Sequence, residues 1–144
     1  MPYKFLDDIA IADVAFEAEG RTLSELFQSA ALAMTNTMVK NLDAILPKQT
    51  KEIIVNAPNT ETLLFNFLQE LIYYKDTEQL LFSKFDIEIT NTEEGGYVLT
   101  SKAFGEKLDV TRHESLTDVK AVTMHMFEVK PEAHGWRAKV ILDI

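Results

Sequence analysis

Residues 12–40 decide the fold; they read ADVAFEAEGRTLSELFQSAALAMTNTMVK. Ala12–Ala18 places apolar side chains on one face at a period of two, which is typical of a half-buried strand. Thr22 lies three residues before Glu25, the spacing of a capping box at the start of a helix. Apolar residues then recur at helical spacing: Leu23, Leu26, Phe27, Ala30, Ala31, Met34 and Met38. We therefore predict a strand followed by an amphipathic helix that ends at about Lys40.

The next segment predicts a second strand and a second helix. Residues 53–57 alternate apolar and polar side chains, and Pro58-Asn59-Thr60 supplies a turn and a helix cap. The apolar positions of this helix are Leu63, Leu64, Phe67, Leu68, Leu71 and Ile72. Phe65 and Tyr73 widen the stripe, which predicts a helix that is buried on more than one side.

The remainder of the chain has the period of strands. A hairpin is expected around the turn at residues 93–96, followed by alternating stretches at Val119–Lys130 and 136–142. The order is strand, helix, strand, helix and four strands. It predicts an α+β fold, with two main helices packed on a mixed, mostly antiparallel β-sheet, in a single compact domain over residues 1–144.

Composition and charge limit the possible functions. The 144 residues contain no cysteine, which excludes a disulfide scaffold, a thiolate metal site and a cysteine nucleophile. The net charge of -9 opposes tight binding to nucleic acid. Residues 1–4 lack the features of a secretion signal, and no apolar run approaches the roughly 18 residues of a membrane span. We therefore expect a cytoplasmic protein without a membrane or a tight nucleic-acid partner.

Two aspartates lie on the polar faces of the first and last predicted strands. Asp143 and Ile144 together offer a side-chain carboxylate, a backbone carbonyl and a terminal carboxylate, and Asp13 adds another carboxylate if the two strands pair. Oxygen donors of this type suit calcium, magnesium or manganese better than zinc. The spacing alone leaves open the alternative that both aspartates are simply solvated.

The three histidines do not form a recognisable catalytic motif. His113 and His134 lie in a charged loop and a turn, where we expect surface positions. His125 alternates with Thr123 and Phe127, which predicts a half-buried imidazole rather than a metal ligand. The chain also lacks a Gly-x-Ser-x-Gly elbow and a glycine-rich phosphate loop. Any nucleotide used must then be held by another protein.

Several segments together resemble the archease family over nearly the whole chain. They are Gly20-Arg21-Thr22-Leu23, Phe27, Ala30-Ala31, Leu63-Leu64, Leu68, Glu70-Leu71, Arg112-His113-Glu114, Val119-Lys120-Ala121-Val122-Thr123, His125, Gly135-Trp136-Arg137-Ala138 and Asp143-Ile144. The C-terminal third carries the most specific part of this resemblance.

The resemblance implies an accessory protein and not an enzyme. Archeases promote guanylylation and multiple turnover of an RtcB-type RNA ligase, which uses GTP and divalent metal in tRNA splicing or RNA repair. The family's metal site corresponds here to Asp13, Asp143 and Ile144. Lys120 and His125 belong to a family motif, which implies secondary roles in activation.

The N-terminus departs from the family pattern, which usually reads Glu-His-Thr-Ala-Asp. This chain reads Ile9-Ala10-Ile11-Ala12-Asp13, so the family's histidine is replaced by Ala10. A two-residue shift would place Asp7-Asp8 on the Glu-His pair, which makes Asp8 a reserve metal ligand. Two alternatives to ligase activation remain open at this stage. One is a free-standing metal-dependent hydrolase or nucleotide-processing enzyme, and the other is a chaperone-like modulator.

Overall fold

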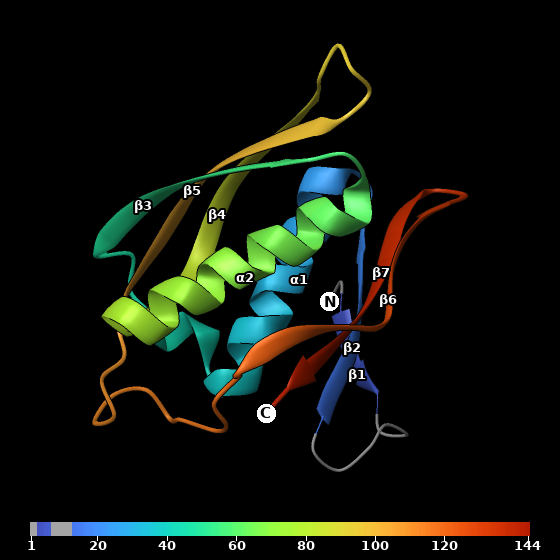
Figure 1. The fold of residues 1–144 in the computed structure, drawn as a ribbon. Helices are drawn as coiled ribbons and strands as arrows, with labels where there is room; N and C mark the ends of the chain where they lie inside the picture. Colours follow the sequence, from blue (N-terminus) through green and yellow to red (C-terminus); the bar gives the residue numbers. More distant parts are fainter. Residues whose placement is uncertain (1–2, 7–12) are drawn as a thin grey trace.

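A computed structural model describes residues 3–6 and 13–144 (Figure 1). In chain order the elements are β1 (Tyr3–Leu6), β2 (Asp13–Gly20), α1 (Leu23–Met38), the short 3-10 helix η1 (Leu42–Ala44), β3 (Gln49–Ala57), α2 (Thr60–Glu78), β4 (Leu80–Asn91), β5 (Tyr97–Lys107), β6 (Ala121–Glu132) and β7 (Gly135–Asp143). The predicted order of helices and strands is confirmed. Two short elements, β1 and η1, escaped sequence analysis.

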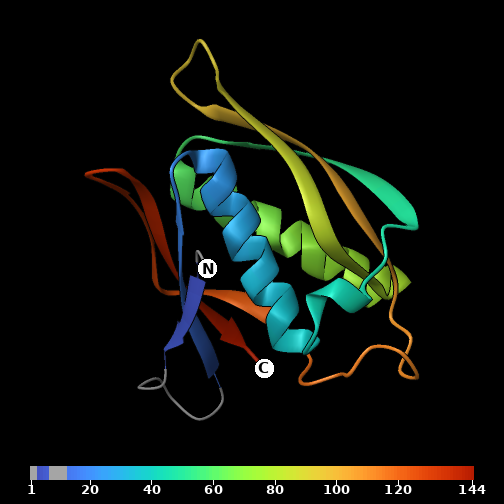
Figure 2. The same cartoon turned by 180° about the vertical axis from the view of Figure 1, so that it is seen from behind.

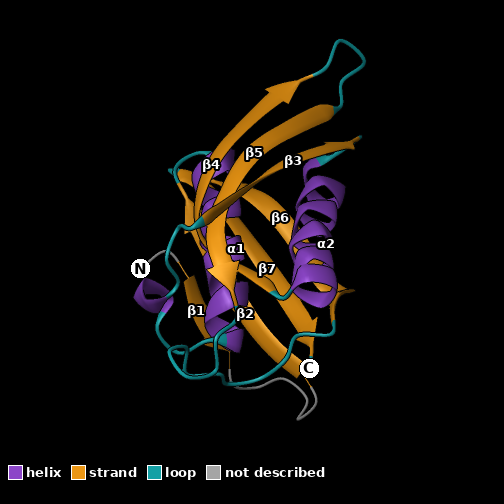
Figure 3. Cartoon of the chain, turned by 90° about the vertical axis from the view of Figure 1, so that its left-hand side faces the viewer, coloured by secondary structure: helices purple, strands orange, loops and turns teal. Residues whose placement is uncertain are grey.

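The strands form two antiparallel sheets with the helices between them. One sheet has the order β1-β2-β7-β6 and the other β3-β5-β4. Helix α1 contacts β2, β4 and β7, and α2 contacts β3, β4 and β6 (Figure 2). From the side, β4 and β5 cross over α1 (Figure 3). The predicted α+β class with two helices packed on β-sheet is confirmed, but the described strands form two sheets in place of one mixed sheet, and every strand pair among the described residues is antiparallel.

Helix α1 is the centre of the core. One sheet lies on either side of α1, so the helix is buried on more than one side. Its buried residues are Leu26, Phe27, Ser29, Ala30, Ala31, Ala33, Met34, Thr35, Thr37 and Met38. The alanines leave room for close packing. The hydroxyl of Thr35 lies 3.1 Å from the carbonyl oxygens of both Ala31 and Phe82, so it is satisfied inside this core.

Helix α2 differs from the prediction. Its buried residues form a single stripe: Leu63, Leu64, Phe67, Leu68, Leu71 and Ile72. Phe65 is half-buried and Tyr73 is exposed, so the buried face of α2 is narrower than expected, while the helix contacts strands of both sheets and is thus covered on more than one side. An aromatic residue beside an apolar stripe can cover the edge of a neighbouring strand. Phe65 does this by packing edge-on against Phe127 of β6.

Side-chain caps start both helices where the sequence predicts them. The Thr22 hydroxyl accepts the Glu25 N–H at 3.1 Å, and the Asn59 side-chain oxygen accepts the Thr62 N–H at 2.8 Å. Helix α1 ends at Met38 because Val39 is extended and bridges to Ser115. No helix within residues 3–6 and 13–144 is long and apolar enough to cross a membrane.

Candidate functional site

The two aspartates of the predicted metal site lie directly opposite each other. Strands β2 and β7 pair antiparallel along their full length, with Asp13 opposite Asp143 at one end and Gly20 opposite Trp136 at the other. Directly opposite residues project from the same face of a sheet, with Cβ atoms about 5 Å apart. The two strands do pair, which is the condition under which Asp13 joins Asp143 in the predicted site.

This arrangement places two negative charges together on a half-buried surface. Asp13 and Asp143 are both partly shielded from solvent. Like charges directly opposite in a sheet destabilise the pair, and a bound cation would remove that repulsion. The geometry thus favours a cation, although the metal site itself stays a prediction.

Asp143 is also held from its other side by β6. Ala121 pairs with Asp143, and the N–H of Lys120 donates to the Asp143 carbonyl oxygen at 2.8 Å. One lone pair of the carbonyl that the sequence offered as a cation donor is thus already used. Lys120 directly precedes β6, and its side chain is exposed to solvent.

The remaining donors around the pair are oxygens. The Ile144 side chain packs against the core, which holds its backbone beside Asp143. Within the described ranges, no three His, Cys, Asp or Glu side chains are close enough to form a metal-binding group. The two carboxylates therefore need the backbone oxygen of Ile144 or water to complete a coordination shell. Such a donor set fits calcium, magnesium or manganese. Asp8 and Ala10 lie outside the described residues.

His125 is exposed, which corrects the expectation of a half-buried imidazole. The register between β6 and β7 shifts between Thr123 and Glu128, where four residues of β6 lie opposite one residue of β7. Met126 has a positive φ of 54° in this bulge. The bulge breaks the alternation of faces and turns Met124, His125 and Met126 toward solvent.

His113 is buried, which corrects the expectation of a surface position. Its Nδ1 accepts the backbone N–H of Asp109 at 2.9 Å, so the proton is on Nε2. Nε2 lies 3.1 Å from both Glu106 Oε2 and the Ala44 carbonyl oxygen. His113 therefore joins β5, η1 and the following loop, and is engaged in structure. His134 is exposed, as expected.

Glu106 is a buried carboxylate that sequence analysis missed. It accepts the Leu46 N–H at 2.7 Å and ion-pairs with Arg112, while Lys48 lies 3.7 Å away. Burial alone would raise the pKa of Glu106, but the hydrogen bonds from Leu46, Arg112 and His113 outweigh it and lower the pKa to about 2. No sequence signal marked it, because the alternation of Leu99, Ser101 and Ala103 assigns position 106 to the opposite face of β5.

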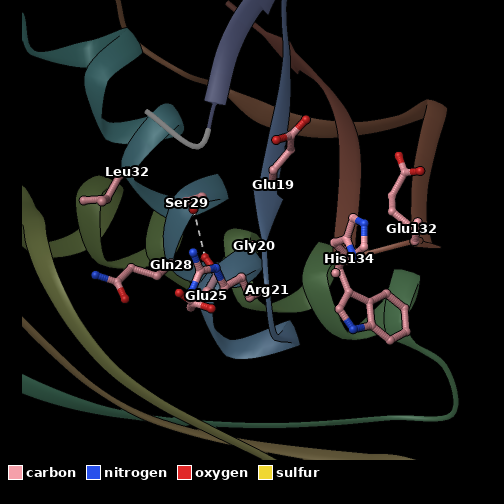
Figure 4. A pocket seen from close by; sticks show the side chains of 12 residues that line it. Glu19, Gly20, Arg21, Glu25, Gln28, Ser29, Leu32, Glu132 and His134 are labelled. Carbon is pink, nitrogen blue, oxygen red and sulfur yellow. Dashed lines mark hydrogen bonds between the residues drawn. The ribbon is translucent and has the colours of Figure 1, made fainter.

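A pocket of about 630 Å³ lies at the far end of the β2–β7 ladder, about 23 Å from the aspartates along the strands. Figure 4 shows Glu132 and His134 on one side of it and Arg21, Glu25 and Gln28 on the other. The Glu132 carboxylate is already paired with Arg137 at 2.6 Å. The pocket contains none of the predicted metal or activation residues.

Comparison with known proteins gives one consistent family. The model of the archease protein family (MTH1598/TM1083) matches residues 3–144. Protein archease of Methanosarcina barkeri is 37% identical over 99% of this chain and 95% of its own. Protein archease of Pyrococcus abyssi is 38% identical over 92% of this chain and 93% of its own.

Solved structures agree with this comparison. The solution structure of Methanobacterium thermoautotrophicum protein 1598 superposes with a TM-score of 0.85, at 36% identity and 99% coverage of both chains. A crystal structure from Thermotoga maritima, described as an archease and possible chaperone, has a TM-score of 0.61 over 96% of this chain and 97% of its own. Its 20% identity supports likeness of fold only.

The Glu106 network predicts a pH-dependent stability. The carboxylate contributes fully above its ordinary pKa of 4.5, and this contribution is lost as the pH falls from about 4.5 toward 2. Glu106→Gln should lower the free energy of unfolding at pH 7 by about 3 kcal/mol, because it breaks a buried charged network. Urea unfolding at pH 7, 5 and 3 measures both effects.

The difference between wild type and Glu106→Gln should narrow between pH 5 and pH 3. Glu114→Gln is the matched control, because Glu114 is exposed and lies 3.6 Å from Lys40 in a surface ion pair. That substitution should change the stability by less than about 1 kcal/mol. An equally stable Glu106→Gln variant at pH 7 would contradict the structural role of this network.

Proposed function

This chain belongs to the archease family, and on that premise we propose that it activates an RtcB-type RNA ligase by promoting guanylylation and multiple turnover. The observation that carries the proposal is the Asp13–Asp143 pair, opposed at one end of the two inner strands of the four-stranded sheet. The role in tRNA splicing or RNA repair comes from the family resemblance.

The residues at this end of the sheet have separate tasks in the proposal. The carboxylates of Asp13 and Asp143, with a backbone oxygen of Ile144, would hold a calcium, magnesium or manganese ion. The ion would supply positive charge able to attract phosphate oxygens. The N–H of Lys120 keeps the Asp143 backbone in place, and we assign the exposed Lys120 side chain a secondary role in activation.

The rest of the surface fits a protein partner better than RNA. A net charge of -9 repels nucleic acid and complements a basic partner surface, so GTP and RNA would be held by the ligase. His125 projects from the β6 bulge on the strand that also carries Ala121, the partner of Asp143. We assign it to contact with the ligase. We place this activity in the cytoplasm.

A free-standing hydrolase is less well supported. That alternative needs His125 beside Asp13 and Asp143, yet these three do not form a metal-binding group within the described residues. His113 is occupied by Glu106 and the Asp109 N–H. We therefore expect no RNA or nucleotide turnover by the purified protein alone.

The ligase role predicts a measurable stimulation. Substoichiometric protein should raise GMP labelling of the cognate RtcB-type ligase over multiple turnovers, and Asp143→Ala should remove at least about 90% of the stimulation because a charged donor is lost. Asp86→Ala is the matched control: Asp86 is an exposed strand aspartate in the other sheet, opposite Lys102. Absence of stimulation at every ratio, with a ligase competent for a single turnover, rules out the proposal.

A chaperone-like function is the second candidate, favoured by exposed methionines. Met124 and Met126 are 59% and 48% exposed, and flexible thioether side chains can adapt to several clients. A chaperone would suppress light scattering from an unrelated aggregating protein, and Met124→Ser/Met126→Ser would weaken the suppression severalfold. The ligase proposal expects no suppression by either form.

A further inference from the structure

Lys75, in the last turn of α2, has its charged group bound to the chain segment that precedes the aspartate site. Its Nζ donates to Asp118 Oδ1 at 2.7 Å and to the Val119 carbonyl oxygen at 2.8 Å, and also pairs with Asp76 at 2.5 Å. The Lys75 side chain is only 12% exposed. A lysine with three oxygen partners and this little exposure is fixed in place, unlike a solvated surface lysine.

The segment that Lys75 holds is hydrogen-bonded to Asp143 through Lys120. Val119 is fully buried, and the next residue, Lys120, donates its backbone N–H to the Asp143 carbonyl oxygen at 2.8 Å. On the other side of this bond, the N–H of Val122 donates to the Gln69 side chain of α2 at 3.2 Å. Helix α2 therefore ties the strand backbone on both sides of the bond that fixes Asp143.

We propose that Lys75 is a positioning residue for Asp143, which acts by holding residues 118–120 so that the Lys120 N–H stays on the Asp143 carbonyl oxygen. The functional consequence rests on the cation site proposed above: the Lys120 bond holds the Asp143 backbone on the β6 side, as the pairing with Asp13 holds it on the β2 side. Lys75 does not touch the cation.

The chemistry of the three partners explains the use of a lysine. An ammonium group has three donors, which match two carboxylates and one carbonyl oxygen. Without the ammonium group, the partly buried Val119 carbonyl would lose its partner, which favours displacement of the segment toward water. Burial alone would lower the pKa of Lys75, but the hydrogen bonds to Asp118 and Asp76 outweigh it and raise the pKa, so Lys75 stays charged.

The first test uses the protein without metal. Lys75→Met should speed hydrogen exchange of the Lys120 amide at least about tenfold in NMR, because its bond to Asp143 opens more often. Amides of the β3–β5 ladder serve as the internal reference. Lys75→Arg should restore protection, and Asp76→Asn should preserve it, since Asp76 lies on α2 itself and does not hold the segment. An unchanged Lys120 amide in a folded Lys75→Met variant overturns the proposal.

The second test measures calcium binding by titration calorimetry. Lys75→Met should weaken binding about tenfold, at the lower end of the effect of groups that orient metal ligands. The sign is informative, because removal of one positive charge changes the net charge from -9 to -10 and would by itself tighten cation binding. If Lys75→Met binds calcium as tightly as wild type or more tightly, the proposal is wrong.

Two further outcomes separate the two proposals. If Lys75→Met does not fold, Asp118→Asn tests the same contact between Lys75 and residues 118–120. The Lys120 amide should again exchange faster than in wild type, by a smaller factor than for Lys75→Met. Unchanged exchange in this variant overturns the proposal. If wild type binds no calcium but the Lys120 amide responds to Lys75→Met, the positioning contact is supported and the cation site is the part that fails.

Discussion

The antiparallel pairing of β2 and β7 is the constraint on which the rest of the structure depends. It joins strands from opposite ends of the chain and places Asp13 opposite Asp143. A slip of one residue would turn one of the two aspartates to the other face, and would also turn the Phe16 side chain out of the core. The apolar faces that bury Phe16 and Val140 therefore fix the geometry of the acidic pair as well.

The acidic pair lies beside the end of a long segment that is bonded to the rest of the fold at several points. The long segment between β5 and β6 is fixed by Glu106 and His113, then by the bond from the Leu116 N–H to the Met38 carbonyl, and last by Lys75. Each of these contacts lies closer to Lys120 along the sequence than the one before it. Together these contacts fix the position of Lys120, whose N–H donates to the Asp143 carbonyl oxygen at 2.8 Å.

The long elements could be predicted from the sequence, because periodicity and caps are local signals. The site at Asp13 and Asp143 was only conditional on the pairing of two distant strands, and the family resemblance supplied the rest. The sequence did not reveal the burial of His113, since this depends on Glu106 and on backbone groups near residue 45, which only the fold brings together. The β6 bulge was also missed, although the alternation of apolar and polar residues changes phase within it, where Met126 and Phe127 are adjacent. Helix α2 seemed more buried than it is, since Phe65 covers β6 at the margin of the core.

We propose that the opposed carboxylates of Asp13 and Asp143 form a cation site. The most direct measurement is the thermal midpoint of the protein alone, with chelator and with calcium, for wild type and Asp13→Asn. Calcium at about 100 times its dissociation constant should stabilise wild type by about 2.7 kcal/mol, a rise of several degrees. Asp13→Asn should match or exceed wild type in chelator, because the repulsion is gone, and should gain nothing from calcium. A wild-type midpoint that calcium, magnesium and manganese all leave unchanged would contradict the claim.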